Sequence, residues 1–85
     1  NNESQSNFEE RIFPIPAKDF ATLELSSIMT DLKIELRDLN GKLLWQNDRV
    51  TETKITIPLS AFASGIYVVI LRNKEYNKVI KLVKE

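Results

Sequence analysis

The sequence predicts an all-β domain built as an antiparallel sandwich. Apolar and polar residues alternate in several short stretches, which is the pattern of strands with one buried face and one wet face. Turn-forming residues separate these stretches at intervals of about ten residues. A run of branched and aromatic side chains at residues 66–71 adds one strongly apolar strand. No segment shows convincing helical periodicity, and we prefer a sandwich to a small barrel.

Residues 1–10 are expected to form a flexible linker and residues 11–85 the sandwich. The first seven residues, NNESQSN, carry no apolar side chain whose burial could offset the entropy lost on ordering. Pro14 and Pro16 then remove two backbone donors and hold the chain extended. This proline segment is interpreted as an edge strand or as a loop that leads into the sandwich.

The middle of the chain is predicted to contain a β-hairpin. Residues 20–25 and 32–37 both alternate, and the second stretch is the clearest strand in the sequence. Asn40-Gly41 follows, a pair that best tolerates positive φ at both central positions of a tight turn. Residues 43–45 are the returning strand, and the polar residues 46–52 are expected to form a turn.

Three further strands are expected in the C-terminal half. Residues 53–57 have strand character until Pro58 ends it. Residues 66–71 are apolar at both parities, which predicts a central strand covered on two faces. Residues 79–83 form the last strand, punctuated by lysines. The resulting fold class is an immunoglobulin-like antiparallel β-sandwich of six to seven short strands.

Length and composition restrict the function classes. The chain of 85 residues is enough for one domain and too short for two. Twelve basic residues balance twelve acidic ones, so a nucleic-acid partner is not expected. The longest apolar run, residues 66–71, is too short to span a membrane. Because the first residue is Asn, we expect a piece of a longer precursor whose targeting signal lies upstream.

The residue types argue against an enzyme and against a bound cofactor or metal. His and Cys are both absent, which removes nucleophilic triads, disulfides and the commonest transition-metal ligands. The acidic residues are spread over predicted wet faces and loops. Asp38-x-Asn40-Gly41 resembles part of a calcium loop, but Leu36 and Asn47 would then occupy the first and last ligand positions. A hairpin turn explains this segment better, and calcium at Asp19 or Asp31 has no support.

Two features leave alternatives open. Trp45 and Tyr67 offer flat rings on which a sugar could stack, although a single Trp in a small sandwich more often packs in the core. Lys78, Lys81 and Lys84 make the last strand basic. These lysines protect an edge strand from aggregation, or they present charge and unpaired backbone groups to a receptor that adds a strand.

The order of motifs resembles a known family. Four blocks follow one another: Phe13-Pro14-Ile15-Pro16-Ala17-Lys18-Asp19-Phe20, then Asp38-Leu39-Asn40-Gly41-Lys42, then Ser64-Gly65-Ile66-Tyr67-Val68-Val69, then a lysine-rich end from Lys78 to Glu85. Over residues 12–85 this order is similar to the type A C-terminal sorting domain of the type IX, or Por, secretion system. The chain has Ile15 where that family usually has Asn, and Asn73-Lys74-Glu75 where it often has Gly.

The resemblance implies a non-catalytic secretion and sorting signal of a Gram-negative bacterium. Its implied partners are an outer-membrane secretion translocon, a sortase-like surface protease, and an upstream cargo domain in the same precursor. The implied route runs through the periplasm to the cell surface or the medium, with cleavage around residues 1–10. The implied recognition residues are Pro14, Pro16, Ala17, Asn40, Gly41, Gly65, Tyr67, Lys78, Lys81 and Lys84. The alternative is a non-catalytic binding or adhesion module, including a carbohydrate-binding one, of a larger secreted protein.

Overall fold

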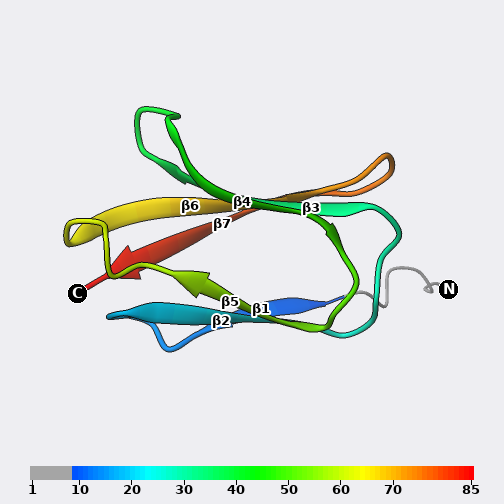
Figure 1. Cartoon of the computed structure of the whole chain (residues 1–85), viewed down its shortest axis with the longest axis horizontal. Coiled ribbons are helices and arrows are strands. Elements are labelled where there is room, and N and C mark those ends of the chain that lie inside the picture. The colour runs from blue at the N-terminus through cyan, green and yellow to red at the C-terminus, as the bar shows by residue number, and fades with distance from the viewer. Residues whose placement is uncertain (1–8) are drawn as a thin grey trace, which may run out of the picture.

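Two antiparallel sheets face each other in the computed structural model, which describes residues 9–85 (Figure 1). One sheet has the strand order β1-β2-β5 and the other the order β4-β3-β6-β7. Within the described range, no residue is helical and no helix could cross a membrane. The strands are β1 (Glu10–Phe13), β2 (Phe20–Leu25), β3 (Leu32–Asp38), β4 (Leu43–Val50), β5 (Lys54–Pro58), β6 (Gly65–Arg72) and β7 (Asn77–Lys84).

The core lies between the two sheets and is formed by one parity of each strand. In β2 the inner positions are buried and the outer positions are not, and β5 follows the same alternation. This is the period-two burial that the sequence predicts. Fully buried side chains meet in the middle, all of them from the two sheets except Leu59, which directly follows β5: Leu23, Leu32, Ile34, Leu36, Ile57, Leu59, Val69, Leu71 and Leu82. The seven strands and their arrangement confirm the predicted immunoglobulin-like sandwich.

Strand β4 is longer than predicted. It pairs with β3 from Leu43 to Val50, so the expectation of a turn over residues 46–52 was wrong. The polar composition has a simple cause, since β4 is an edge strand of the four-stranded sheet and Val50 is its one buried residue. A bulge interrupts the pairing where Arg49 has a φ of 54°.

The turn between β3 and β4 also differs from the prediction. The Gly41 N–H donates to the Asp38 carbonyl at 3.0 Å, which places Leu39 and Asn40 at the central positions. Only Gly41 has a positive φ, of 89°, among the residues of this turn. The hairpin therefore has an ordinary turn followed by a left-handed glycine, and not a two-residue turn centred on Asn40-Gly41.

Strand β6 is central, as expected, because it lies between β3 and β7. The prediction that both of its faces are covered was wrong. Tyr67, Val69 and Leu71 are buried against the core, whereas Ile66 on the other parity is 42% exposed. The outer face of the four-stranded sheet therefore carries apolar side chains of β6 that are exposed or only partly buried by neighbouring strands.

Candidate functional site

Most of the residues singled out from the sequence gather at one end of the sandwich, which we call the C-terminal end. It comprises the β1–β2 loop at residues 14–19, the β3–β4 turn, the start of β6 and the end of β7 (Figure 1). Eight residues of the predicted set lie there: Pro14, Pro16, Ala17, Asn40, Gly41, Gly65, Tyr67 and Lys84. Lys81 lies in the middle of β7, and Lys78 lies toward the opposite end.

The β1–β2 loop is anchored to the last strand through Ala17. The Ala17 N–H donates to the Val83 carbonyl at 2.8 Å, and the Glu85 N–H donates to the Ala17 carbonyl at 2.7 Å. Ala17 is fully buried, whereas Pro14 and Pro16 are exposed. The chain bends at both prolines, whose preceding peptide bonds are cis, and it is not extended as predicted. A short bent loop thus covers part of the edge of β7.

Tyr67 fixes the connection that precedes β6. Its hydroxyl donates to the Ala63 carbonyl, and its ring centroid lies 6.3 Å from that of Phe62. Such a tie from the start of a strand back to the preceding corner is common in immunoglobulin-like sandwiches. The Lys84 ammonium donates to the Phe62 carbonyl at 2.8 Å, so β7 holds the same connection. The Tyr67 hydroxyl therefore ties the β5–β6 connection to the start of β6.

Gly65 starts β6 with a φ of +154°, a conformation that residues with side chains rarely adopt. Its pairing partner in the sheet is Lys84. The backbone conformation at the start of β6 therefore favours glycine over a residue with a side chain. Gly65 and Lys84 lie next to the Ala17 bridge, which makes one contiguous backbone unit at this end.

The β3–β4 turn is held by side chains on both sides. One Asp38 carboxylate oxygen accepts hydrogen bonds from the N–H groups of Asn40 and Lys42, each at 2.9 Å. This use of Asp38 is that of a turn residue, in agreement with the hairpin interpretation. On the outer face, the Arg37 guanidinium donates to the Gly41 carbonyl at 2.6 Å.

Glu35 connects this turn to the centre of the outer face and was not singled out from the sequence. Its carboxylate lies 3.1 Å from Arg37 Nε and 3.2 Å from Arg72 Nη2, and its side chain is only 3% exposed. The residue occupies a polar position of the alternation, so nothing in the pattern marks it as buried. Two arginine arms cover it, and they satisfy both carboxylate oxygens.

The opposite end of the sandwich is closed by Glu10. One of its carboxylate oxygens accepts from the Tyr76 hydroxyl at 2.6 Å, and the other lies 3.3 Å from Lys78 Nζ. Burial, followed by the hydrogen bond and the negative charge of Glu10, raises the pKa of Tyr76 to about 12. Lys78 therefore joins the two sheets, a structural contact that the sequence did not indicate.

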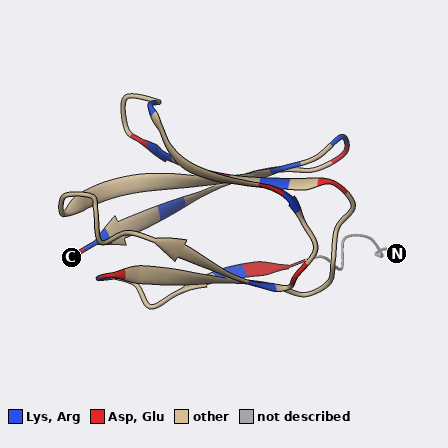
Figure 2. Ribbon diagram, viewed as in Figure 1, with Lys and Arg blue, Asp and Glu red and all other residues tan. Residues whose placement is uncertain are grey.

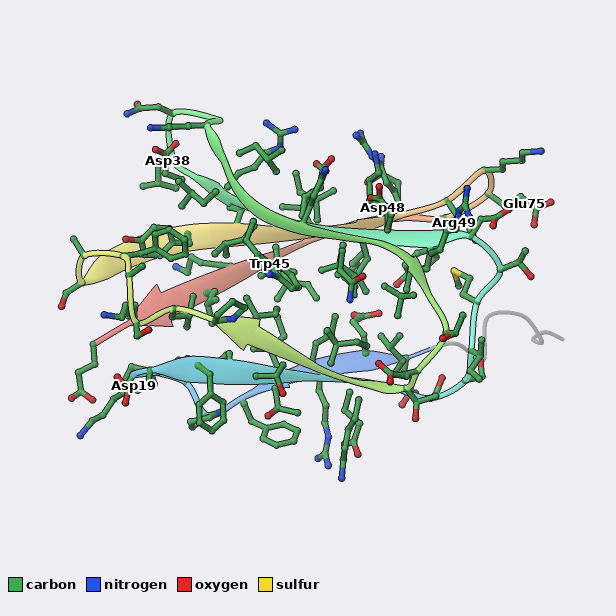
Figure 3. All side chains as sticks on the ribbon, in the orientation of Figure 1. Asp19, Asp38, Trp45, Asp48, Arg49 and Glu75 are labelled. Atoms are coloured by element: carbon green, nitrogen blue, oxygen red, sulfur yellow. The ribbon has the colours of Figure 1, made fainter. Side chains whose placement is uncertain are left out.

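The described residues offer little to a metal or a sugar. Within residues 9–85, no group of three acidic side chains is placed to hold a metal ion. Figure 3 shows Asp19, Asp38, Asp48 and Glu75 on separate loops and strands. Trp45 packs against the core and lies between the sheets in the same view, so the sugar-stacking alternative gains no support from it.

Comparison with known proteins decides the family. The model of the secretion system C-terminal sorting domain matches residues 11–85. The chain belongs to this family. The sequence resemblance to a type IX sorting domain is thereby confirmed, and export to the cell surface or the medium through that system follows for the sorting domain. The alternative of a binding or adhesion module has no support.

The fold of the sorting domain recurs in a solved structure. PorZ is described as an essential bacterial surface component of the type IX secretion system of human oral-microbiomic Porphyromonas gingivalis. It is similar with a TM-score of 0.72 at 22% identity, over 89% of this chain and 11% of the PorZ chain. The sorting domain thus spans a small part of PorZ, and the likeness shows a shared fold. No curated protein matches.

Proposed function

We propose that this domain is a folded sorting signal that does no chemistry of its own. An outer-membrane translocon recognises it in the periplasm and moves it outward together with an upstream cargo. A sortase-like surface protease then cleaves the sorting domain from the cargo. The observation that carries the proposal is the match to the sorting-domain family across residues 11–85.

The C-terminal end of the sandwich is the proposed recognition surface. Of the predicted residues at this end, Pro14, Pro16 and Asn40 expose their side chains and are proposed to contact the translocon. Ala17 and Tyr67 are buried, so their proposed role is to position the loops that carry the exposed residues. The glycines at the β3–β4 turn and at the start of β6 allow the backbone geometry of this end. Recognition of a rigid surface needs little reorganisation on binding.

Cleavage is proposed to occur before the sandwich begins. The Glu9 N–H donates to the Ser26 hydroxyl at 2.8 Å, and β1 starts at Glu10, the last residue of the predicted linker. Residues 1–8 of that linker lie outside the described residues. A protease needs an extended and accessible chain, and paired strand residues do not provide one. The scissile bond is therefore proposed to precede Glu9.

An export assay tests the function. The chain is fused to the C-terminus of a periplasmic fluorescent cargo in a bacterium that has the type IX system, and the cargo is measured in the periplasm, on the surface and in the medium. Export of the fusion but not of the cargo alone is the expected result. Retention of a folded, intact fusion in the periplasm would contradict the proposal.

Deleting residues 77–85 would not distinguish lost recognition from lost folding. That deletion removes all of β7 and uncovers one edge of β6. The truncated domain would then fail to fold as well as fail to be recognised. Substitutions of exposed residues at the C-terminal end, such as Pro16→Ala, separate these two causes, because folding can be checked independently by circular dichroism.

A further inference from the structure

Strand β7 has an open edge over part of its length. The Val83 carbonyl and the Glu85 N–H both point away from β6, since Ala17 bonds to them. In an antiparallel pair the outward-pointing residues alternate, so the N–H and carbonyl groups of Val79 and Lys81 point the same way. Within residues 9–85, no backbone group bonds to these two residues on that side.

We propose that β7 accepts an extended segment of a partner protein along residues 77–81, by β-strand addition. The inference rests on the proposed sorting function and names how one partner in export is bound. Ala17 already pairs with this edge through a parallel bridge to Lys84. The edge of β7 can therefore accept a backbone alongside it. The same bridge occupies the edge from Val83 onward and so confines the added strand to the open part.

The side chains beside the open edge define the chemistry of the partner. Val79 is 58% exposed and projects, like Lys81, from the outer face of the sheet, where it pairs with Ile70. Lys78 and Lys84 are engaged with Glu10 and with the Phe62 carbonyl. Lys81 forms no ion pair within the described range, and Figure 2 shows the basic residues of β7 as blue segments along the strand.

A complementary strand therefore carries an apolar side chain opposite Val79 and a carboxylate opposite Lys81. These two partner residues are two positions apart in either strand direction, because alternate residues share a face. The backbone hydrogen bonds provide affinity, and the two side chains provide selectivity.

Strand β7 of a second copy fits the edge poorly. Antiparallel self-pairing centred on Ile80 places Lys81 opposite Val79, and pairing centred on Lys81 places two lysines opposite each other. Neither register offers Lys81 a carboxylate, and like charges directly opposite destabilise a sheet. Lysine on an exposed edge is a known defence against this kind of self-association.

Proline substitution at an outward residue tests the inference while leaving the hydrogen bonds between β6 and β7 in place. The Lys81 N–H makes no bond to β6, so Lys81→Pro removes an edge donor and blocks strand addition but keeps the β6–β7 ladder. Lys81→Glu reverses the charge and keeps the backbone. Lys74→Glu, in the exposed β6–β7 loop, is the matched charge control.

Each variant is fused to the fluorescent cargo, and folding is checked by thermal unfolding. Lys81→Pro and Lys81→Glu are each expected to lower the exported fraction by about tenfold. A change of this size corresponds to the loss of a few hydrogen bonds or charge contacts with the added strand. Lys74→Glu is expected to export like the wild type. Normal export of Lys81→Glu overturns the inference, even where Lys81→Pro fails to fold.

If the wild type stays in the periplasm, the sorting function fails and this inference fails with it. A domain dimer in sedimentation that Lys81→Pro abolishes would also overturn it, because the edge would then belong to a second copy.

Discussion

Ala17 and Lys84 form a parallel bridge that joins the first loop of the domain to its last strand. The bridge uses two backbone hydrogen bonds, from Ala17 to Val83 and from Glu85 to Ala17, and the Ala17 side chain is fully buried beneath it. The first and last motif blocks of the sequence therefore fold as one unit. Any change that moves the β1–β2 loop should also disturb the end of β7.

Enlarging Ala17 should displace this loop. Ala17→Leu is expected to lower the free energy of unfolding by about 1–3 kcal/mol, because extra methylene groups in a filled site force neighbours apart. Urea unfolding measures the change. Lys18→Leu is the control, since the adjacent side chain is exposed and should tolerate the same residue. Equal stability of the two variants would show that Ala17 is not tightly enclosed.

The Tyr67 hydroxyl should contribute to stability through the Ala63 carbonyl alone. Tyr67→Phe keeps the ring in contact with Phe62 and removes the hydrogen bond. A loss of about 1 kcal/mol is expected, the usual net value of such a bond. Chemical unfolding with an unchanged far-ultraviolet spectrum checks it. A variant as stable as the wild type would mean that water replaces the hydroxyl without cost.

Side-chain alternation was enough to predict the strands but not their contacts. Residues 20–25 and 32–37 were found because every second residue in them is apolar and faces the core. Residues 46–50 were missed because this part of the edge strand is mostly polar, which is also the composition of a turn. The Asn40-Gly41 turn was found, but its type depends on hydrogen bonds to Asp38 that the pair itself does not specify.

The sequence predicted which residues belong to the candidate site but not that they lie together in space. Pro14, Ala17, Gly65 and Lys84 come from separate blocks, and only the topology brings them to one end of the sandwich. The Ala17 bridge is made by backbone atoms, which leave no mark in the side-chain pattern. The burial of Glu35 depends in the same way on arginine arms from β3 and β6. Long-range pairing is the information that a single sequence lacks.

Glu35 should be important to stability in a way that exposed ion pairs are not. Glu35→Ala removes a carboxylate that is 3% exposed and leaves Arg37 and Arg72 facing each other, so a loss of about 1–3 kcal/mol is expected. Glu24→Ala is the control, because its pair with Arg11 lies on the solvent side and should contribute about 1 kcal/mol at most. Urea unfolding of both variants ranks the two sites. A smaller loss for Glu35→Ala than for Glu24→Ala would refute the argument.

Tyr76 should make the fold sensitive to alkaline pH. Its pKa is raised from 10.0 to about 12 by burial and by Glu10, so the folded state favours the neutral phenol. The neutral phenol stabilises the fold fully below a pH of about 10, and this contribution is lost as the pH rises toward 12. In Tyr67→Phe, where Tyr76 is the one tyrosine left of two, the tyrosinate absorbance should titrate with a midpoint of about 12. Unfolding free energies of Tyr76→Phe should fall less steeply over the same interval than those of the wild type, whose lysines titrate identically. A midpoint near 10, or parallel stability profiles, would mean that Tyr76 is neither buried nor in contact with Glu10 in solution.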